Sequence, residues 1–369
     1  MAGYFATWQA NLLDRGWNLS ELALLVSVSL TLGLVLDIPF GIFADRIGNK
    51  KTVLFAFIVF AVGFLVPTLS VHPVPLASLV IMIAIGNALL SGALESWSAD
   101  LQSRETKKVS TRFFLGLDQF QRLGMISGAL TLPFLTSKIS SGNSSTWGIY
   151  FIVALGVLLV AIKIPDVKHK VASKDLASAG SSFFNSKIAL LACGFIFYGF
   201  SDGIVQVAFW PKMVNAGIES LFGLGLIQAS MSAARMIGGE VWKRTRFIES
   251  DRAPTIALLL SAVPFYFFSY SSGPVESGFI WLVRIFLLSL YFPAVSNALQ
   301  HTFKGNKNRV AILSLMSTLG VIGSILVSAG VGVISRDNEM KSGIVLDSLI
   351  VFGAVSSVVA GLCLVRIKR

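Results

Sequence analysis

The strongest constraint on the fold of this chain is a succession of long apolar segments. They lie at about 22–43, 52–69, 76–99, 113–136, 147–164, 188–211, 219–242, 254–271, 278–299, 310–334 and 343–365. Each is close to the ~20 residues that an α-helix needs to cross ~30 Å of hydrocarbon. Lipid offers no partners for backbone amides, and these segments are too long and too uniformly apolar for barrel strands. We therefore predict an all-α, polytopic membrane fold with about eleven complete spans.

The composition and the charge agree with a membrane protein. Hydrophobic residues make up 54% of the chain and charged residues 13%, and the mean hydropathy is +0.76. Soluble domains carry about 25% charged residues. The net charge of +11 would suggest nucleic acid binding in a soluble protein, but here the basic residues gather in alternate loops. We expect a lipid bilayer around the chain and no nucleic acid partner.

The same basic residues predict the orientation of the spans. About 22 of the 30 Lys and Arg residues fall in loops on the side of the segment 41–51, and about five fall on the other side. By the positive-inside rule, the segment 41–51, the polar segment 166–186 and the C-terminus are cytoplasmic. We expect a multi-pass protein of the cell membrane.

The two halves of the sequence match one another at an offset of about 200 residues. The matches include Gly41 and Arg46 with Gly239 and Arg244, Leu101 and Gln102 with Leu299 and Gln300, and Leu123 and Gly124 with Leu319 and Gly320. Because the offset relates helices of the same direction, it predicts a parallel duplication. Residues 166–186 are polar and lack a periodic apolar face, which is typical of a linker. We predict an N-terminal helical bundle over 1–165, a cytoplasmic linker over 166–186 and a C-terminal helical bundle over 187–369.

The duplication predicts that the first helix is partial. At this offset, the helix that begins near Lys187 corresponds to a position upstream of Met1, so only an outer half-helix from Gly3 to Leu13 is present. Three interpretations stay open: the true start lies upstream, the chain is truncated, or the first residues form a short interfacial helix.

A charged hairpin, Gly41-Ile-Phe-Ala-Asp45-Arg46-Ile-Gly48-Asn-Lys50-Lys51, connects the first two long segments. Glycine at position 41 lets a neighbouring helix approach closely, and Gly48 can take a positive φ in a tight turn. The hairpin resembles the loop signature G-x-L-A-D-R-x-G-R-K of the major facilitator superfamily, from which it departs at Phe43 and Asn49. This resemblance implies a transporter fold of two six-helix bundles, here with its first helix truncated.

The resemblance also implies that the hairpin acts as a conformational latch. In the family, the carboxylate that matches Asp45 helps to hold the two bundles together on the cytoplasmic side when the cavity faces outward. Candidate partners for Asp45 are Arg104, Arg112 and the start of the segment near Arg309. The alternative is that the hairpin only sets topology and turn geometry. The predicted latch residues are Gly41, Asp45, Arg46, Gly48, Lys50, Arg104 and Arg112.

Ionisable residues inside the apolar segments are functional candidates, because a charge at the membrane centre costs about 2.5–3.5 kcal/mol on insertion scales. Substrate sites of duplicated transporters lie near the midplane, where the repeats meet. The residues predicted to line this cavity are Arg122, Asp202, Gln206 and Arg284. Further candidate proton or ion-pair sites are Asp37, Glu95, Asp118 and Arg235.

Two questions about these charges stay open. Asp118 and Arg122 lie one helical turn apart and could simply neutralise each other. Alternatively, the guanidinium of Arg122 could bind a carboxylate or phosphate through bidentate hydrogen bonds. Asp202 is either the protonation site of a coupled transporter or the structural partner of a cation such as Arg284.

Signatures of several other protein classes are absent from the sequence. We find no His/Asp/Glu metal cluster, no Gly-x-Ser-x-Gly elbow and no phosphate loop, so we expect no enzyme, no metal and no other cofactor. The helix-four arginine signature of proton-driven exporters and the Gly-Pro-x-x-Gly-Gly run of drug antiporters are also missing.

We therefore expect a secondary active transporter that moves a small molecule across the membrane by alternating access. Asp202 favours proton coupling, and the arginines inside apolar segments favour an organic anion as substrate. A drug or metabolite efflux antiporter is the alternative, and a non-transporting ligand sensor or an inactive truncated carrier is the alternative from another class. The expected partners are the substrate, a proton or other coupling ion and the bilayer, and we expect a monomer.

Overall fold

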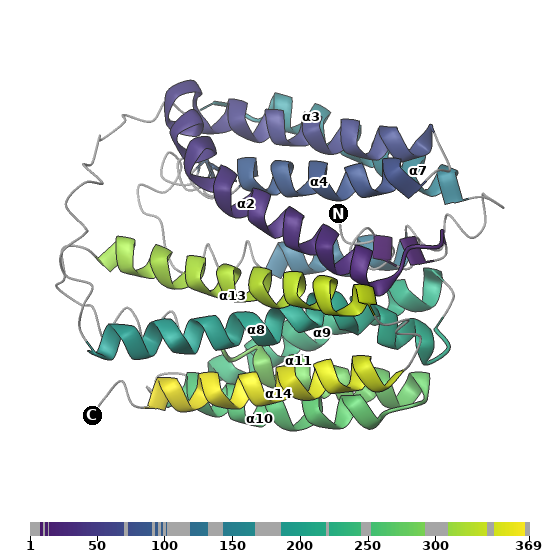
Figure 1. Ribbon diagram of the computed structural model, residues 1–369. Helices are drawn as coiled ribbons and strands as arrows, with labels where there is room; N and C mark the ends of the chain where they lie inside the picture. Colours follow the sequence, from purple (N-terminus) through teal and green to yellow (C-terminus); the bar gives the residue numbers. More distant parts are fainter. Residues whose placement is uncertain are drawn as a thin grey trace. The chain divides into compact units, whose positions relative to one another are not determined.

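Every regular element in the described part of the protein is a helix (Figure 1). The computed structural model describes residues 8–9, 12–13, 15–69, 73–90, 93–94, 97–98, 101, 119–131, 143–166, 186–218, 221–244, 252–291, 309–337 and 343–365. The long helices are α2 (Leu19–Ile47), α3 (Asn49–Thr68), α4 (Pro73–Leu90), α7 (Asn143–Lys163), α8 (Ser186–Asn215), α9 (Leu221–Arg244), α10 (Ala253–Tyr270), α11 (Pro274–Leu288), α13 (Arg309–Asp337) and α14 (Gly343–Val365). A further helical stretch covers residues 119–131. The predicted all-α class is confirmed.

The chain forms two compact units. Unit 1 comprises Met1–Trp17 and Val28–Lys174, and unit 2 comprises Asn18–Ser27 and Asp175–Arg369. The start of α2 thus groups with unit 2, where the Ser20 hydroxyl donates a hydrogen bond to the carbonyl of Gly332 on α13. Residues 167–185 of the predicted linker lie outside the described residues.

In unit 1, α3 packs against both α4 and α7. Small residues allow the close approach: a Cβ atom on Gly63 of α3 would lie 3.0 Å from Cβ of Met82 on α4. On the other side of α3, the ring of Phe64 stacks on that of Tyr150 of α7, with centroids 5.3 Å apart. The unit is therefore held by close helix packing and by aromatic contacts.

In unit 2, α8 packs against α13 and α14, α14 against α10, and α11 against α10 and α9. The contact of α8 with α13 depends on glycine, because a Cβ atom on Gly203 would lie 2.8 Å from backbone atoms of Ser324. The Ser324 hydroxyl donates to the carbonyl of Gly199 at 2.9 Å. Small side chains thus bring these two backbones together and let a hydroxyl bridge them.

Within the described residues, the helices follow the apolar segments closely but differ from the prediction in the segment 278–299. We predicted a continuous helix there, but α11 begins earlier, at Pro274, and ends at Leu288, followed by a turn at 289–290. Proline is favourable in the first turn of a helix. At the other end, the Ser289 hydroxyl donates to the carbonyl of Phe286 at 2.6 Å. Pro293 follows in the sequence and disfavours continuation of the helix.

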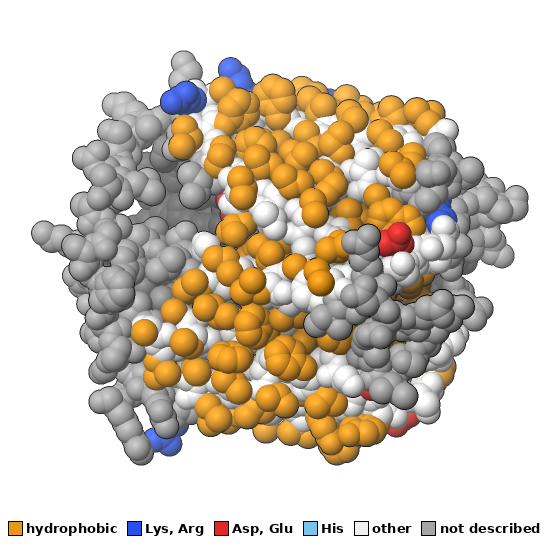
Figure 2. All heavy atoms as spheres, in the orientation of Figure 1, with side chains coloured by type: hydrophobic (Ala, Val, Ile, Leu, Met, Phe, Trp, Pro, Cys, Tyr) orange, Lys and Arg blue, Asp and Glu red, His pale blue; other side chains and the backbone are white. Residues whose placement is uncertain are grey.

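Five helices within the described residues are long and apolar enough to cross a membrane, and three shorter helices are also apolar. The five segments are Leu19–Asp37, Asn49–Thr68, Ala189–Asn215, Ala253–Tyr270 and Leu346–Leu364. Hydrophobic side chains cover most of the described surface in the view of Figure 2. An apolar surface of this extent is typical of contact with lipid.

Candidate functional site

A buried arginine forms the centre of the polar groups inside unit 2. Arg284 lies on α11 and is 3% exposed. Its guanidinium carbon lies 4.0 Å from the ring centroid of Phe265 and 4.5 Å from that of Trp281. Both rings attract the cation through their π faces. Trp281 in turn stacks on Phe209 of α8, with centroids 4.4 Å apart, so the rings that hold the arginine are themselves fixed.

The guanidinium of Arg284 keeps one N–H donor that is not hydrogen-bonded within the described residues. Its Nη2 donates to the hydroxyl of Ser201 on α8 at 3.4 Å, and Ser201 shares a 2.7 Å hydrogen bond with Ser357 of α14. The Nε of Arg284 is buried and has no hydrogen-bond partner among the described residues. An unsatisfied donor on a buried charge is costly, because nothing replaces its hydrogen bond to water. The arginine therefore has donor capacity for an acceptor from outside the unit's own side chains.

Asp202 follows Ser201 on α8 and is close enough to Arg284 to interact with its charge. Its Oδ2 accepts a hydrogen bond from Nε2 of Gln206 at 2.8 Å, one helical turn further on. The charge of Asp202 stabilises the cation of Arg284, whereas the charge of Arg235 on α9 opposes it. Three helices, α8, α9 and α11, thus place four polar side chains close enough to one another to interact: Asp202, Gln206, Arg235 and Arg284. We call these four residues the arginine cluster.

The cavity predicted from the sequence draws on both units. Asp202, Gln206 and Arg284 lie in unit 2, whereas Arg122 lies in the helical stretch 119–131 of unit 1, where it is half-buried. Asp118, the alternative partner of Arg122, lies outside the described residues. The inclusion of Arg122 in a common cavity stays a prediction.

The structure gives the predicted turn at the hairpin between α2 and α3. Gly48 separates the two helices with φ of +98°, which glycine adopts without strain. Lys50 donates from Nζ to the carbonyl of Ile162 at 2.9 Å, so it anchors the hairpin to the end of α7. Arg46 is exposed. Among the described residues, no atom lies within 4 Å of a Cβ built on Gly41, so close helix approach does not explain that glycine in this structure.

Several predicted residues lie outside what the structure describes. The side chain of Asp45 and the residues Glu95, Arg104 and Arg112 belong to this group, so the latch stays a prediction. Asp37 is described and is exposed on α2.

The cavity residues predicted from the sequence did not include the serine and aromatic members of the site. Ser201 precedes Asp202 directly, and Trp281 lies three residues before Arg284, on the same helical face. These spacings are signals that could have identified both residues. Phe265 and Ser357 come from other helices, and no local pattern marks them.

No group of three or more His, Cys, Asp or Glu side chains that could hold a metal ion occurs within the described residues. The arrangement in unit 2 instead offers one open guanidinium donor, a nearby carboxylate and aromatic faces. Such a set can bind an anionic group and can carry a proton, but it contains no activated nucleophile within the ranges described.

Comparison with known proteins gives one family. The model of the Major Facilitator Superfamily matches residues 1–328. The chain is 23% identical over 364 residues to YxaM of Bacillus subtilis (strain 168), an uncharacterized MFS-type transporter, covering 89% of this chain and 84% of the relative. It is 27% identical over 138 residues to the uncharacterized MFS-type transporter YdeE of Escherichia coli (strain K12), covering 35% of each.

Solved structures with the same fold are also found. A crystal structure of a mutant of the nucleoside transporter NupG matches with a TM-score of 0.76 at 12% identity, covering 100% of this chain and 96% of that one. The E. coli fucose:proton symporter FucP matches with a TM-score of 0.59 at 14% identity, covering 100% and 97%. At these identities the likeness concerns the fold alone.

Proposed function

This chain belongs to the major facilitator superfamily, and we propose that it is a secondary active transporter that carries a small organic anion with protons by alternating access. The family match spans residues 1–328, and the similar structures have the superfamily fold. The resemblance and the fold predicted from the hairpin and the duplication are thereby confirmed. The superfamily is a class of membrane transporters rather than of enzymes, so a membrane setting and a small-molecule substrate follow from membership.

We choose an anion because Arg284 is a buried cation whose Nε–H donor is not hydrogen-bonded within the described residues. The guanidinium is 3% exposed, its hydrogen bond goes to a neutral hydroxyl, and its Nε is unsatisfied within the described residues. Carboxylate and phosphate groups are the acceptors that match a guanidinium in charge and in geometry. An anionic group of the substrate would supply the missing acceptor.

The charges of the arginine cluster support the same choice. It contains two arginines and one aspartate, and Arg235 opposes the charge of Arg284. A bound anion would offset this repulsion. A cationic substrate would add to it, and a neutral substrate would leave it unchanged.

Asp202 is our proposed proton carrier. An anion at Arg284 adds a negative charge beside the carboxylate of Asp202, and a proton on Asp202 would restore the charge of the loaded site. Gln206, which already donates to Oδ2, would hold the side chain in place in either protonation state. Coupling to protons is also consistent with a fold shared with a fucose:proton symporter.

The test begins with ligand binding by the purified chain. A set of small carboxylates and phosphate monoesters is screened by thermal shift, and each compound that stabilises the protein is then measured as flux into proteoliposomes. We expect at least one anion to bind and to be transported. Arg284→Gln should abolish binding, whereas Lys51→Gln, which removes an exposed cation of the hairpin, should leave binding intact.

Each result has a defined meaning. Binding and flux that survive Arg284→Gln would contradict the proposed site. Binding without flux down an imposed gradient would instead support a ligand sensor. Stabilisation by nucleosides or neutral sugars, the compounds named for two of the similar structures, would replace the anion with a neutral substrate.

For the setting of the protein, we propose the cell membrane, with the linker and the C-terminus in the cytoplasm, and a monomer as the working unit. The excess of basic residues on the side of segment 41–51 supports this orientation.

A further inference from the structure

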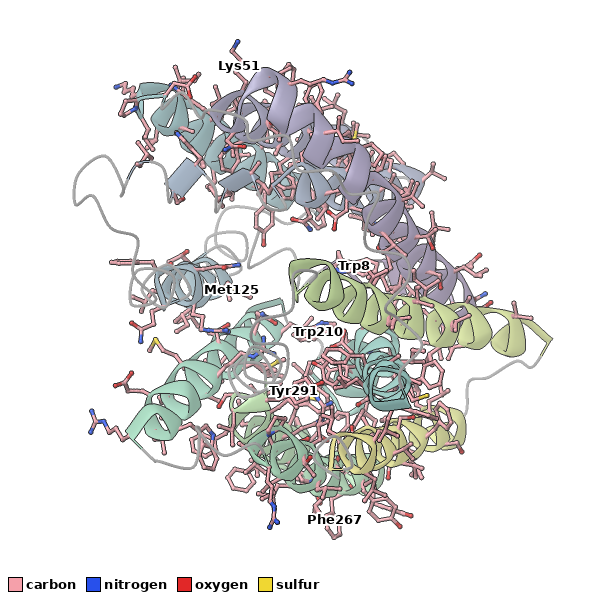
Figure 3. All side chains as sticks on the ribbon, turned by 90° about the vertical axis from the view of Figure 1, so that its left-hand side faces the viewer. Trp8, Lys51, Met125, Trp210, Phe267 and Tyr291 are labelled. Carbon is pink, nitrogen blue, oxygen red and sulfur yellow. The ribbon has the colours of Figure 1, made fainter. Side chains whose placement is uncertain are left out.

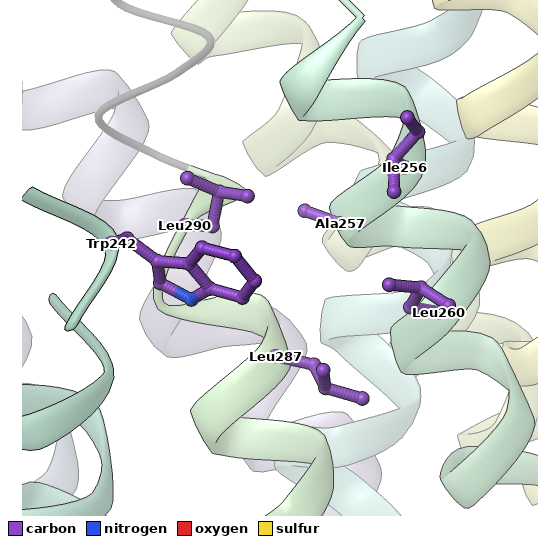
Figure 4. Close-up of a pocket in the computed structure, with 6 residues that line it drawn as sticks. All are labelled: Trp242, Ile256, Ala257, Leu260, Leu287 and Leu290. Atoms are coloured by element: carbon purple, nitrogen blue, oxygen red, sulfur yellow. The ribbon is translucent and has the colours of Figure 1, made fainter. Parts of the chain in front are cut away.

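An apolar groove lies in unit 2 between side chains of α9, α10 and the end of α11 (Figure 4). Its volume is about 280 Å³, just below the ~300–1,000 Å³ that is usual for small-molecule sites. The end of α9, the start of α10 and the end of α11 supply its walls. The residues that line it are Trp242, Ile256, Ala257, Leu260, Leu287 and Leu290.

The groove continues two stripes of exposed apolar side chains. On α10, the exposed residues Leu260, Val263 and Phe267 follow one another at helical spacing, and Figure 3 shows Phe267 at the rim of the bundle, pointing away from the helices. On α11, Phe279 and Val283 are exposed and lie at four-residue intervals before Leu287. Stripes of this kind face hydrocarbon in a membrane protein. An apolar groove that opens between them would be filled by hydrocarbon, because apolar cavities do not retain water.

Two arginines lie near the groove, at the C-terminal end of α9 and the N-terminal end of α10. Arg244 is the last residue of α9, two positions after Trp242. Arg252 immediately precedes α10 and is exposed, four positions before Ile256, so it lies one helical turn beyond the groove. The positive-inside rule assigns this end to the cytoplasm, where anionic lipids attract basic residues.

Among the described residues, Arg244 has an acidic neighbour on its own helix. Arg244 Nε lies 4.0 Å from Oε1 of Glu240, one turn earlier on α9, and both side chains are exposed. Exposed pairs of this kind contribute little, so a phosphate could take the place of the carboxylate at low cost.

We propose that this groove binds an anionic phospholipid, with an acyl chain between α10 and α11 and the phosphate at Arg244 and Arg252. The apolar walls, the continuity with the exposed stripes and the cations at the cytoplasmic end all match this one occupant. Trp242 is placed at the boundary between the chain and the headgroup, where indole rings are enriched in membrane proteins. The proposal does not depend on the identity of the transported substrate.

The test uses a photoactivatable phosphatidylglycerol that carries its reactive group in the acyl chain. The full chain is reconstituted into phosphatidylcholine vesicles with phosphatidylglycerol as the minority lipid, irradiated, and mapped by peptide mass spectrometry. Labelling should concentrate on peptides that contain Leu260 and Leu287. Leu287→Trp, which fills the groove, should remove most of it, whereas Phe279→Trp, two turns away on the same stripe, should leave it intact.

The headgroup is tested separately with the same probe and its phosphatidylcholine analogue. We expect preferential labelling by phosphatidylglycerol, reduced about fivefold by Arg252→Gln and similarly by Arg244→Gln, because one basic residue near an anionic surface contributes on this scale. Lys51→Gln should have no effect. Elution and thermal unfolding of each variant show that it is folded, and Leu260→Phe fills the groove from the opposite wall if Leu287→Trp does not fold.

Three results would overturn the proposal. Labelling spread evenly along the exposed stripes would mean that the groove is not a site. Equal labelling by both lipids would mean that the arginines do not select an anion. A crosslink from groove residues to a second copy of the chain would identify the groove as a protein interface.

Discussion

The ammonium group of Lys212 lies 2.6 Å from Oδ1 of Asp347, and it also donates to the carbonyl of Ser269 at 3.0 Å. These contacts join the C-terminal ends of α8 and α10 to the start of α14. The lysine side chain is 12% exposed and the aspartate side chain 39% exposed, so the pair is only partly shielded from solvent. Lys212 thus links three helices of unit 2, α8, α10 and α14, at one end of the unit.

Removal of this pair should lower the stability of unit 2 moderately. We expect Lys212→Met and Asp347→Asn each to reduce the unfolding temperature, with a coupling free energy of about 1 kcal/mol, because solvent at Asp347 screens the interaction. The measurement is thermal unfolding of both single variants and the double variant in detergent. Strictly additive effects would show that the two side chains do not interact.

The glycine contact between α8 and α13 gives a sharper prediction. Gly203→Ala places a methyl group 2.8 Å from backbone atoms of Ser324, which cannot move without a shift of the helix. We expect a loss of about 1–3 kcal/mol, as for other overpacked cores. The control is Gly330→Ala on α13, where no described atom lies within 4 Å of the new methyl group and where higher helix propensity should keep or raise stability. Equal effects of the two substitutions on the unfolding temperature would contradict the packing described for unit 2.

Two glycines of the hairpin should respond differently to alanine. Gly48 has φ of +98°, so Gly48→Ala strains the turn, whereas Gly41 lies inside α2 and no described atom lies within 4 Å of a Cβ built on it. We expect Gly48→Ala to destabilise the protein by about 1 kcal/mol and Gly41→Ala to be neutral or slightly stabilising. Thermal unfolding measures both. A large loss at position 41 would show that this glycine serves a contact which forms in another conformation, as the latch hypothesis requires.

The rings around Arg284 should matter for ligand binding. Phe265→Leu removes one cation–π contact, worth about 0.5–2 kcal/mol, so affinity for the bound anion should fall by about 2–30-fold. Phe267→Leu changes a ring on the exposed stripe of the same helix and should leave affinity unchanged. Isothermal titration with an anion from the thermal-shift screen measures both variants. Unchanged affinity in the first would mean that the ring does not hold the arginine in its binding geometry.

The sequence predicted the class of the fold well because membrane spans follow from length and hydropathy. The apolar segment 343–365 coincides with α14, and the positive φ at Gly48 followed from the tight turn that the hairpin requires. The break after Leu288 was not foreseen, since hydropathy does not record where a side chain such as that of Ser289 caps a helix.

The candidate site was predictable only in part. Asp202 and Arg284 stood out because ionisable residues are rare inside apolar segments. Phe265 could not be found in this way, because it approaches Arg284 from another helix and resembles every other core aromatic in the sequence. The pair of Lys212 and Asp347 was missed for a related reason: its residues are 135 positions apart and lie near the ends of their helices.

Proton-driven accumulation in proteoliposomes tests the central claim most directly. Vesicles that contain the chain are given an inward proton gradient, and uptake of a labelled anion from the screen is followed above its equilibrium level. We expect the wild-type chain and Asp166→Asn, an exposed control, to accumulate the anion, and Asp202→Asn to lose accumulation while it still exchanges anion across the membrane. Undiminished proton-driven accumulation by Asp202→Asn would contradict the proposed coupling, and no movement of any bound anion by the wild-type chain would contradict transport itself.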